Sequence, residues 1–166
     1  LMAGTMDSFL IYRLTHRHAT DYSNASRTQL FDIHNLQWDS EICKMFDLPL
    51  SMLPHVRYSD SIFGKTTFEG IFDTPILLCG VMGDAHAALF AQRCIHAGMG
   101  KISYGDGASV MINTGLHPVL SDDLSVSLAW GMEKKIQYVL EGNVNYAGAL
   151  LDWMAANLEL APDREH

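Results

Sequence analysis

The most informative pattern in the chain is an apolar run that leads through two glycines into a helix-forming segment. Residues 76–79 (ILLC) are continuously apolar, which predicts a short strand buried on both faces. Gly80 and Gly83 let the backbone turn sharply, and the alanine-rich residues 84–91 then favour a helix. Asp84 stands at the predicted N-cap of that helix. A carboxylate between a buried strand and a helix is placed where open α/β sheets carry their chemistry, although capping alone also explains it.

The residues before this segment predict mainly helices and loops. Thr5 or Asp7 caps a short helix, whose apolar positions are predicted to face inward at Phe9, Leu10, Ile11 and Leu14. A second helix is predicted over residues 38–46, where apolar side chains recur at helical spacing. Residues 58–72 alternate like strands between glycine turns. The polar loop 21–27 is interpreted as a set of local side-chain turns with no catalytic role.

The residues after position 100 predict two hairpins and a helix. Residues 101–115 read as a strand, a turn and a second strand, with glycines on both sides of Asp106 in the turn. Residues 124–130 alternate apolar and small polar side chains, which predicts a half-buried strand, and residues 136–140 predict its partner. A helix is predicted over residues 146–160, with an apolar face made by Leu150, Leu151, Met154 and Leu158.

Composition and charge narrow the class of protein. The chain has 166 residues, of which 48% are hydrophobic and 18% are charged, so it is globular and long enough to bury a core. Its net charge of −8 argues against a nucleic-acid partner, because such proteins need a basic surface. No apolar run approaches the roughly 20 residues of a membrane span, and no signal peptide is visible. The chain opens at Leu1 almost directly in a helical segment, so we expect a piece of a larger protein.

Cysteine and histidine usage favours a reducing compartment without a histidine-ligated metal. The three cysteines are widely spaced and make no C-x-x-C motif, which favours buried free thiols in the cytoplasm. The eight histidines include no H-E-x-x-H or similar pair, so the sequence predicts no histidine metal site.

Two glycine motifs are candidates for binding phosphate. In the Gly105-Asp106-Gly107 turn, consecutive backbone N–H groups can point at an anion, although Asp-Gly is also a strong signal for an ordinary type I′ hairpin. Gly148 lies in the first turn of the last predicted helix, where the helix dipole favours negative charge. Simple helix packing explains this glycine equally well. Neither motif is similar to a P-loop or to a dinucleotide-binding turn.

Four segments taken together resemble one family. They are DYSNASRTQLFDIHNLQWD, GVMGDAHAALFAQRC, GMGKISYGDGASVMINTG and YVLEGNVNYAGALLDW. Their order and spacing resemble the FGGY carbohydrate kinases, in particular the glycerol kinase-like members, and the resemblance covers residues 4 to about 160.

This resemblance implies an α/β fold of the ribonuclease H-like (actin/hexokinase-type ATPase) class, present only in part. Residues 1–97 would be the end of the first, substrate-binding domain. Residues 98–166 would be the first strands and helix of the second, nucleotide-binding domain. The family's N-terminal phosphate loop and its adenine-binding region have no counterpart in this chain.

The resemblance also implies roles for single residues. Asp84 matches the family's catalytic aspartate, which binds the acceptor hydroxyl and takes its proton as general base. Ser109 matches a position beside the acceptor. The implied phosphate- and nucleotide-binding positions are Gly105, Asp106, Gly107, Gly148 and Asp152. The implied reaction is transfer of phosphate from ATP, with Mg²⁺, to a hydroxyl of a polyol or sugar, and the resemblance allows a homo-oligomer.

Several positions depart from the glycerol kinase-like pattern. Asp106 replaces the usual threonine, so its carboxylate repels phosphates unless Mg²⁺ mediates. Ser109 replaces a phenylalanine, which favours a more polar or bulkier acceptor. Ala85-His86 replaces a Gln-Gln pair, where His86 either reaches the cleft or packs, and Asp152 replaces a glutamine. The alternative to a kinase is therefore a non-catalytic regulatory relative that binds sugar or nucleotide and keeps the fold.

Overall fold

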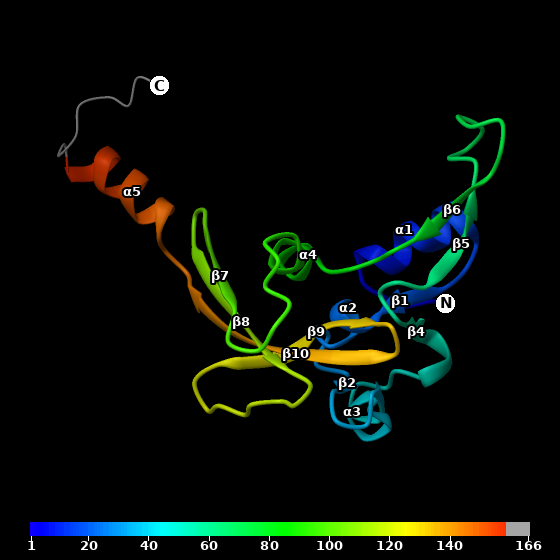
Figure 1. Ribbon diagram of the computed structural model, residues 1–166, viewed down its shortest axis with the longest axis horizontal. Helices are drawn as coiled ribbons and strands as arrows, with labels where there is room; N and C mark the ends of the chain where they lie inside the picture. Colours follow the sequence, from blue (N-terminus) through cyan, green and yellow to red (C-terminus); the bar gives the residue numbers. More distant parts are fainter. Residues whose placement is uncertain (159–166) are drawn as a thin grey trace.

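The computed structural model describes residues 1–158, which form a mixed α/β structure (Figure 1). The first part contains α1 (Met6–Thr15), β1 (Ala19–Asp21), α2 (Tyr22–Ala25), β2 (Phe31–Asp32), β3 (Gln37–Trp38), α3 (Ser40–Met45), a 3₁₀ turn (Leu50–Met52), β4 (His55–Arg57), β5 (Ile62–Thr66), β6 (Ile76–Cys79) and α4 (Asp84–Ala91). The second part contains β7 (Gly100–Tyr104), β8 (Ala108–Gly115), β9 (Ser125–Met132), β10 (Lys135–Val144) and α5 (Gly148–Leu158).

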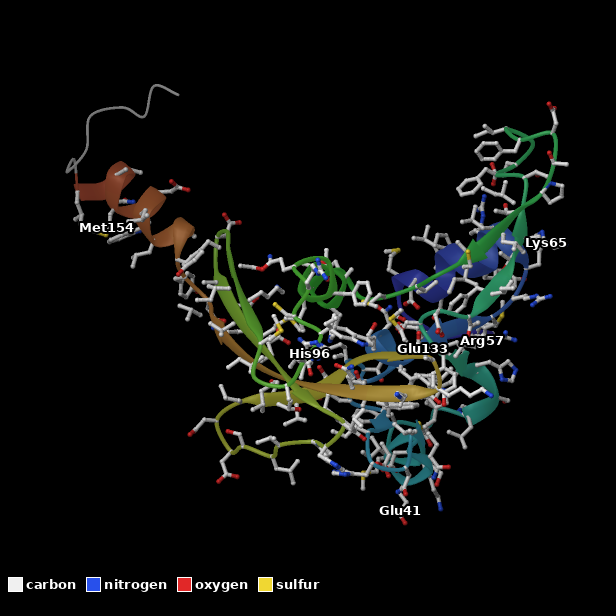
Figure 2. All side chains as sticks on the ribbon, viewed as in Figure 1. Glu41, Arg57, Lys65, His96, Glu133 and Met154 are labelled. Atoms are coloured by element: carbon white, nitrogen blue, oxygen red, sulfur yellow. The ribbon has the colours of Figure 1, made fainter. Side chains whose placement is uncertain are left out.

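The second part is built on an antiparallel sheet in the order β7-β8-β10-β9. Both predicted hairpins are confirmed: the Gly105–Gly107 turn joins β7 to β8, and Glu133 with Lys134 joins β9 to β10. Those two residues have φ values of 50° and 61°, the left-handed pair that a two-residue hairpin turn requires. Figure 2 shows Glu133 at that end of the hairpin. The last predicted helix is confirmed as α5, and its predicted end lies outside the described residues.

The first part holds three small sheets, in which β1 pairs with β4, β2 with β3, and β5 with β6. The prediction that residues 76–79 form a strand is confirmed, but the prediction of burial on both faces is wrong. Ile76 and Leu77 are 42% and 47% exposed. The reason is topological: within the described residues β6 pairs only with β5, in an antiparallel ribbon that extends from the body of the structure (Figure 1).

Two hydrophobic clusters join the first part to the β7–β10 sheet. In one cluster, Leu89 of α4 packs with Met111 of β8 and Val139 of β10. In the other, Ala25 and Phe31 pack with Leu128 of β9 and Tyr138 of β10. Helix α4 therefore lies over this sheet (Figure 1). Residues on both sides of position 97 share these clusters, and the domain boundary itself stays a prediction.

The observed helix starts lie within two residues of the predicted ones, as for α3 (Ser40 against 38) and α5 (Gly148 against 146). Asp39 caps α3, because its carboxylate accepts the backbone N–H groups of Glu41 and Ile42. The N-cap of α4 is Gly83 rather than the predicted Asp84, which is the first helical residue. In α1, only Ile11 of the four predicted inward positions is buried.

The three cysteines are free, and Cys43 and Cys94 are buried as predicted. The prediction of burial is wrong for Cys79, which is exposed on the β5–β6 ribbon. No helix within residues 1–158 is long and apolar enough to cross a membrane.

Candidate active site

The structure brings the two predicted phosphate motifs into direct contact. Gly148, at the start of α5, donates its N–H to the carbonyl of Gly105 at 2.9 Å. The N–H groups of Ala147 and Ala149 donate to the carbonyl of Asp106 at 2.7 and 3.1 Å. A Cβ on Gly148 would lie 2.6 Å from the Gly105 oxygen, so no other residue fits without a shift. The hairpin turn and the helix start therefore form one unit, although the motifs lie more than forty residues apart in sequence.

This contact shows that Gly148 has a packing role in the structure. Its N–H is already bonded to the hairpin, so close packing is observed there, and phosphate binding by this N–H stays a prediction. Gly107 is held just as closely, because a Cβ there would lie 2.7 Å from the Val144 oxygen. Asp152 is exposed on α5, four residues after Gly148 and thus on the same side of the helix.

A cavity of about 510 Å³ lies beside the Gly105–Gly107 turn. It is lined by Ser103, Tyr104, Gly105, Gly107, Ala108, Ser109, Asn143, Val144 and Asn145. Ser109, for which the family resemblance implied a place beside the acceptor, is therefore on the cavity wall next to the turn. The Asp106 side chain is exposed at the tip of the same turn.

Asp84 occupies the first turn of α4, where its side chain is exposed. Its carboxylate accepts the N–H of Ala85 at 2.6 Å. Among the hydrogen bonds of the described residues, none joins Asp84 to the Gly105–Gly107 turn or to α5. Helix α4 does pack on the same sheet that carries the turn, through Leu89. The structure thus places Asp84 above the sheet, and its catalytic role stays a prediction.

Residues 21–27, predicted as a polar loop, contain α2 and have a wider role than local turns. Asp21 is fully buried and accepts the N–H groups of Ser23 and Asn24. These are local side-chain bonds of the predicted kind, but here they cap α2, a helix that the sequence did not predict. Its carboxylate also accepts the Ser59 hydroxyl at 2.6 Å. The Ser23 hydroxyl in turn accepts the N–H of Gly83 at 2.8 Å, directly before Asp84.

Sequence reasoning missed these long-range bonds of the loop. The Ser59 hydroxyl accepts the N–H of Gly131 at 3.2 Å, so the Asp21 network joins β9 to the start of α4. Ser59 lies 38 residues from Asp21 along the chain, and Gly83 lies 60 residues from Ser23. No local pattern marks such partners. The only available signal was a dense group of polar residues in a chain with few charges.

His86 packs rather than lining a cleft. Its side chain is 3% exposed, and Nε2 lies 3.3 Å from the Ser127 hydroxyl of β9. Arg27 and Glu141 form an ion pair in the same region. Burial, followed by the positive charge of Arg27, lowers the pKa of His86 to about 4. The neutral imidazole is therefore the form that the folded chain accommodates near pH 7.

We expect the His86→Gln substitution to reduce the acid sensitivity of folding. As the pH falls from 6.5 toward about 4, His86 binds a proton in the unfolded chain but stays neutral in the folded chain. Stability therefore decreases over this window, by up to about 3 kcal/mol at its lower end. Urea unfolding at pH 7 and pH 4.5 measures the effect. The wild type should lose more stability than the variant, and equal losses would show that His86 does not titrate in this way.

Comparisons with known proteins agree with this architecture. Residues 2–91 match the FGGY family of carbohydrate kinases, N-terminal domain. The chain is 44% identical to a glycerol kinase of Thermococcus kodakarensis over 160 residues, which cover 96% of this chain and 32% of that protein. Its structure is similar to that of Plasmodium falciparum glycerol kinase with ADP, with a TM-score of 0.87 and 35% identity over 97% of this chain and 33% of that one.

A xylulose kinase from Lactobacillus acidophilus shares the fold, with a TM-score of 0.77 at 21% identity over 91% of this chain and 31% of that one. The predicted fold class, a partial α/β fold of the actin/hexokinase type, is confirmed by these neighbours. The chain spans about a third of the length of the curated relatives it matches. More than half of its residues match the family's N-terminal domain, and the chain therefore belongs to the FGGY family of carbohydrate kinases.

Proposed function

We propose that this chain is part of an ATP- and Mg²⁺-dependent kinase that phosphorylates a hydroxyl of a polyol or sugar. The observation that carries the proposal is the contact between the Gly105–Gly107 turn and the start of α5. Two motifs that family resemblance assigns to nucleotide meet there, next to a cavity of about 510 Å³. Exposed backbone and a cavity at one place are what a phosphate-bearing substrate requires.

In this proposal Asp84 acts as general base. An ionised carboxylate is an acceptor, and the exposed Asp84 can bind an acceptor hydroxyl and take its proton as the phosphoryl group moves. Phosphoryl transfer depends mainly on positioning and electrostatic stabilisation, so the fixed start of α4 matters as much as the acid itself. The hydrogen bond from Gly83 to Ser23 supplies this fixing, because it holds the residue before Asp84 against the buried Asp21.

The donor set of the turn fits Mg²⁺ and ATP. Magnesium is usually held by one or two carboxylates together with substrate phosphates, and Asp106 offers one exposed carboxylate at the turn. Within residues 1–158, no group of three or more His, Cys, Asp or Glu side chains is arranged to hold a metal, so substrate oxygens would complete the coordination. When bound, MgATP would supply the phosphoryl group. The metal ion would neutralise the negative charge of the phosphates, which the Asp106 carboxylate would otherwise repel.

We expect Asp106→Asn to raise the Mg²⁺ concentration that gives half-maximal activity of the full-length protein by about tenfold, because one negative charge beside the ion is lost. Asp123→Asn, at an exposed loop carboxylate, is the matched control and should leave the value unchanged. Titrating Mg²⁺ at saturating ATP measures this effect. A lower KM for ATP with an unaltered Mg²⁺ requirement would mean that Asp106 only repels phosphate.

The second candidate function is a non-catalytic relative that binds sugar or nucleotide. One observation favours it: the exposed carboxylate of Asp106 stands at the turn, where it would repel phosphate. Assays of the full-length protein with ATP over a panel of polyols and sugars separate the two functions. Turnover of at least one acceptor supports the kinase, and nucleotide or sugar binding without turnover supports the relative.

The remaining expectations belong to the same proposal. Residues 1–166 alone should not phosphorylate any acceptor, because no segment of them matches the family's N-terminal phosphate loop.

Three free cysteines favour a cytoplasmic location of the whole protein, and a homo-oligomer is compatible with the proposal.

A further inference from the structure

His86 joins the first turn of α4 to the β7–β10 sheet. Its ring is 3% exposed, and Nε2 lies 3.3 Å from the hydroxyl of Ser127, which is itself 1% exposed on β9. Ser127 is directly opposite Val139 of β10, which packs in the same cluster as Leu89 of α4. Directly opposite residues of antiparallel strands point to the same face of a sheet. The contact between His86 and Ser127 therefore lies on the face that α4 covers.

The same ring also lies against the residue that precedes Asp84. A Cβ built on Gly83 would lie 2.9 Å from Nδ1 of His86, which is too close for a real Cβ atom. The backbone of Gly83 has a φ of −59° and a ψ of 145°, values that most residues adopt. The ring, rather than the backbone conformation, is therefore what a side chain at position 83 would meet. The imidazole fills the space between the N-cap of α4 and β9.

The backbone around the N-cap, more than any side-chain partner, sets the position of the Asp84 carboxylate. Among the hydrogen bonds of the described residues, this carboxylate accepts only the N–H of its neighbour Ala85. The N-cap itself has two contacts with other parts of the structure: the N–H of Gly83 donates to the Ser23 hydroxyl at 2.8 Å, and the His86 ring lies against Gly83. A change at either contact therefore moves the carboxylate.

Charged groups on four segments act on the His86 ring. Arg27 after α2 and Lys101 of β7 oppose a positive charge on the ring, whereas Glu141 of β10 and Asp84 of α4 favour one. Burial is the largest influence, and it lowers the pKa of His86, so the ring is neutral near pH 7. A neutral imidazole has one donor and one acceptor nitrogen, and the hydroxyl on β9 can pair with either. The contact with β9 is therefore made by an uncharged ring.

We propose that His86 is a positioning residue for phosphoryl transfer: its ring holds the N-cap of α4 against β9 and so fixes the place of the Asp84 carboxylate. This rests on the proposed kinase function. A general base works only within hydrogen-bond reach of the proton that it takes, and a shift of about 1 Å can cost roughly 10²-fold in rate. The ring itself is buried, so His86 acts through Asp84 and touches no substrate.

The first test is the steady-state kinetics of His86→Ala and His86→Gln in the full-length protein. We expect His86→Ala to lower kcat roughly 10- to 100-fold with little change in KM for the acceptor, because only the placement of the base is altered. The glutamine amide also donates and accepts, so His86→Gln should keep most of the wild-type kcat. His18→Ala removes a histidine whose Nε2 lies 3.0 Å from the Ala3 carbonyl oxygen, and this matched control should leave both constants unchanged. A wild-type kcat in His86→Ala would overturn the proposal.

The contact between the ring and Gly83 allows a double-variant test. Gly83→Ala places a methyl group against the ring and should lower kcat by displacing the N-cap. In the double variant Gly83→Ala/His86→Ala, the methyl group enters the space that the ring occupied. This variant should therefore be no slower than His86→Ala alone. Losses that multiply would show that the ring does not act through the N-cap and would overturn the proposal. Gly83→Ala keeps the ring, so it also carries the kinetic test if His86→Ala does not fold.

Amide hydrogen exchange separates failure of the positioning role from failure of the kinase, because it needs no turnover. In the folded full-length protein, His86→Ala or Gly83→Ala should speed exchange over residues 83–88 about tenfold, whereas His86→Gln should not. Exchange over residues 40–45 of α3 is the internal reference and should stay the same in all variants. Faster exchange at the start of α4 in a protein that phosphorylates nothing would support the hold on the N-cap and contradict the kinase. Unchanged exchange in His86→Ala and Gly83→Ala would overturn the positioning role whatever the kinetics.

Discussion

Replacing Asp84 with asparagine is expected to lower kcat of the full-length protein by roughly 10²–10⁴-fold, the usual contribution of a positioned general base. Asparagine keeps the shape and the helix position of Asp84 but cannot take a proton. Because only proton transfer is lost, KM for the acceptor should change far less than kcat. Steady-state kinetics over a range of acceptor concentrations give both values.

The matched control for this variant is Asp47→Asn. Asp47 is also exposed and has a φ of 51°, a conformation that asparagine adopts readily. This control should leave both kinetic constants unchanged. If Asp84→Asn retained the wild-type kcat, Asp84 would have no part in the reaction, and its position at the start of α4 would be structural only.

The Asp21→Ala substitution is expected to cost the fold about 3–5 kcal/mol of unfolding free energy. The buried carboxylate accepts hydrogen bonds from the Ser23 and Asn24 backbones and side chains and from the Ser59 hydroxyl. Alanine would leave several buried donors without an acceptor, and each such donor costs about 1–3 kcal/mol. Urea unfolding of the wild type and the variant measures the loss.

Asp32 offers a control with the same local geometry at the surface. Its carboxylate accepts the N–H groups of His34 and Asn35 at 2.8 and 3.0 Å, as Asp21 does for α2, but water can replace it there. Asp32→Ala should therefore cost much less unfolding free energy than Asp21→Ala. Equal losses in the two variants would show that the long-range bonds of Asp21 add nothing to local capping.

The sequence predicted best those elements whose signals are local. The β7–β8 hairpin followed from its Gly-Asp-Gly turn, and the presence of β9 followed from alternation of apolar and small residues. The prediction that this strand is half-buried is wrong, because residues 127–131 are buried on both faces. Helix α3 followed from the cap at Asp39. In each case the residues that specify the element are its own neighbours in the chain, so no tertiary contact was needed for the prediction.

Burial and long-range contacts could not be predicted in the same way. An apolar run such as residues 76–79 fits a buried strand, but its exposure depends on which strands pair with it, and only β5 does so within residues 1–158. The close contact of Gly148 with Gly105 came from tertiary packing that no local pattern encodes. For the candidate site, residue types and family resemblance indicated the turn and Ser109, whereas the placement of Ser103 and Asn143 beside Ser109 needed the strand register.

The most direct measurement is a crystal structure of the full-length protein with ADP, Mg²⁺ and a polyol. The account predicts an acceptor hydroxyl within about 2.6–3.2 Å of the Asp84 carboxylate, the range of a productive hydrogen bond. It also predicts the nucleotide phosphates at the Gly105–Gly107 turn and the acceptor beside Ser109. A polyol bound away from Asp84, or an Asp84 carboxylate separated from the turn by packed side chains, would contradict it.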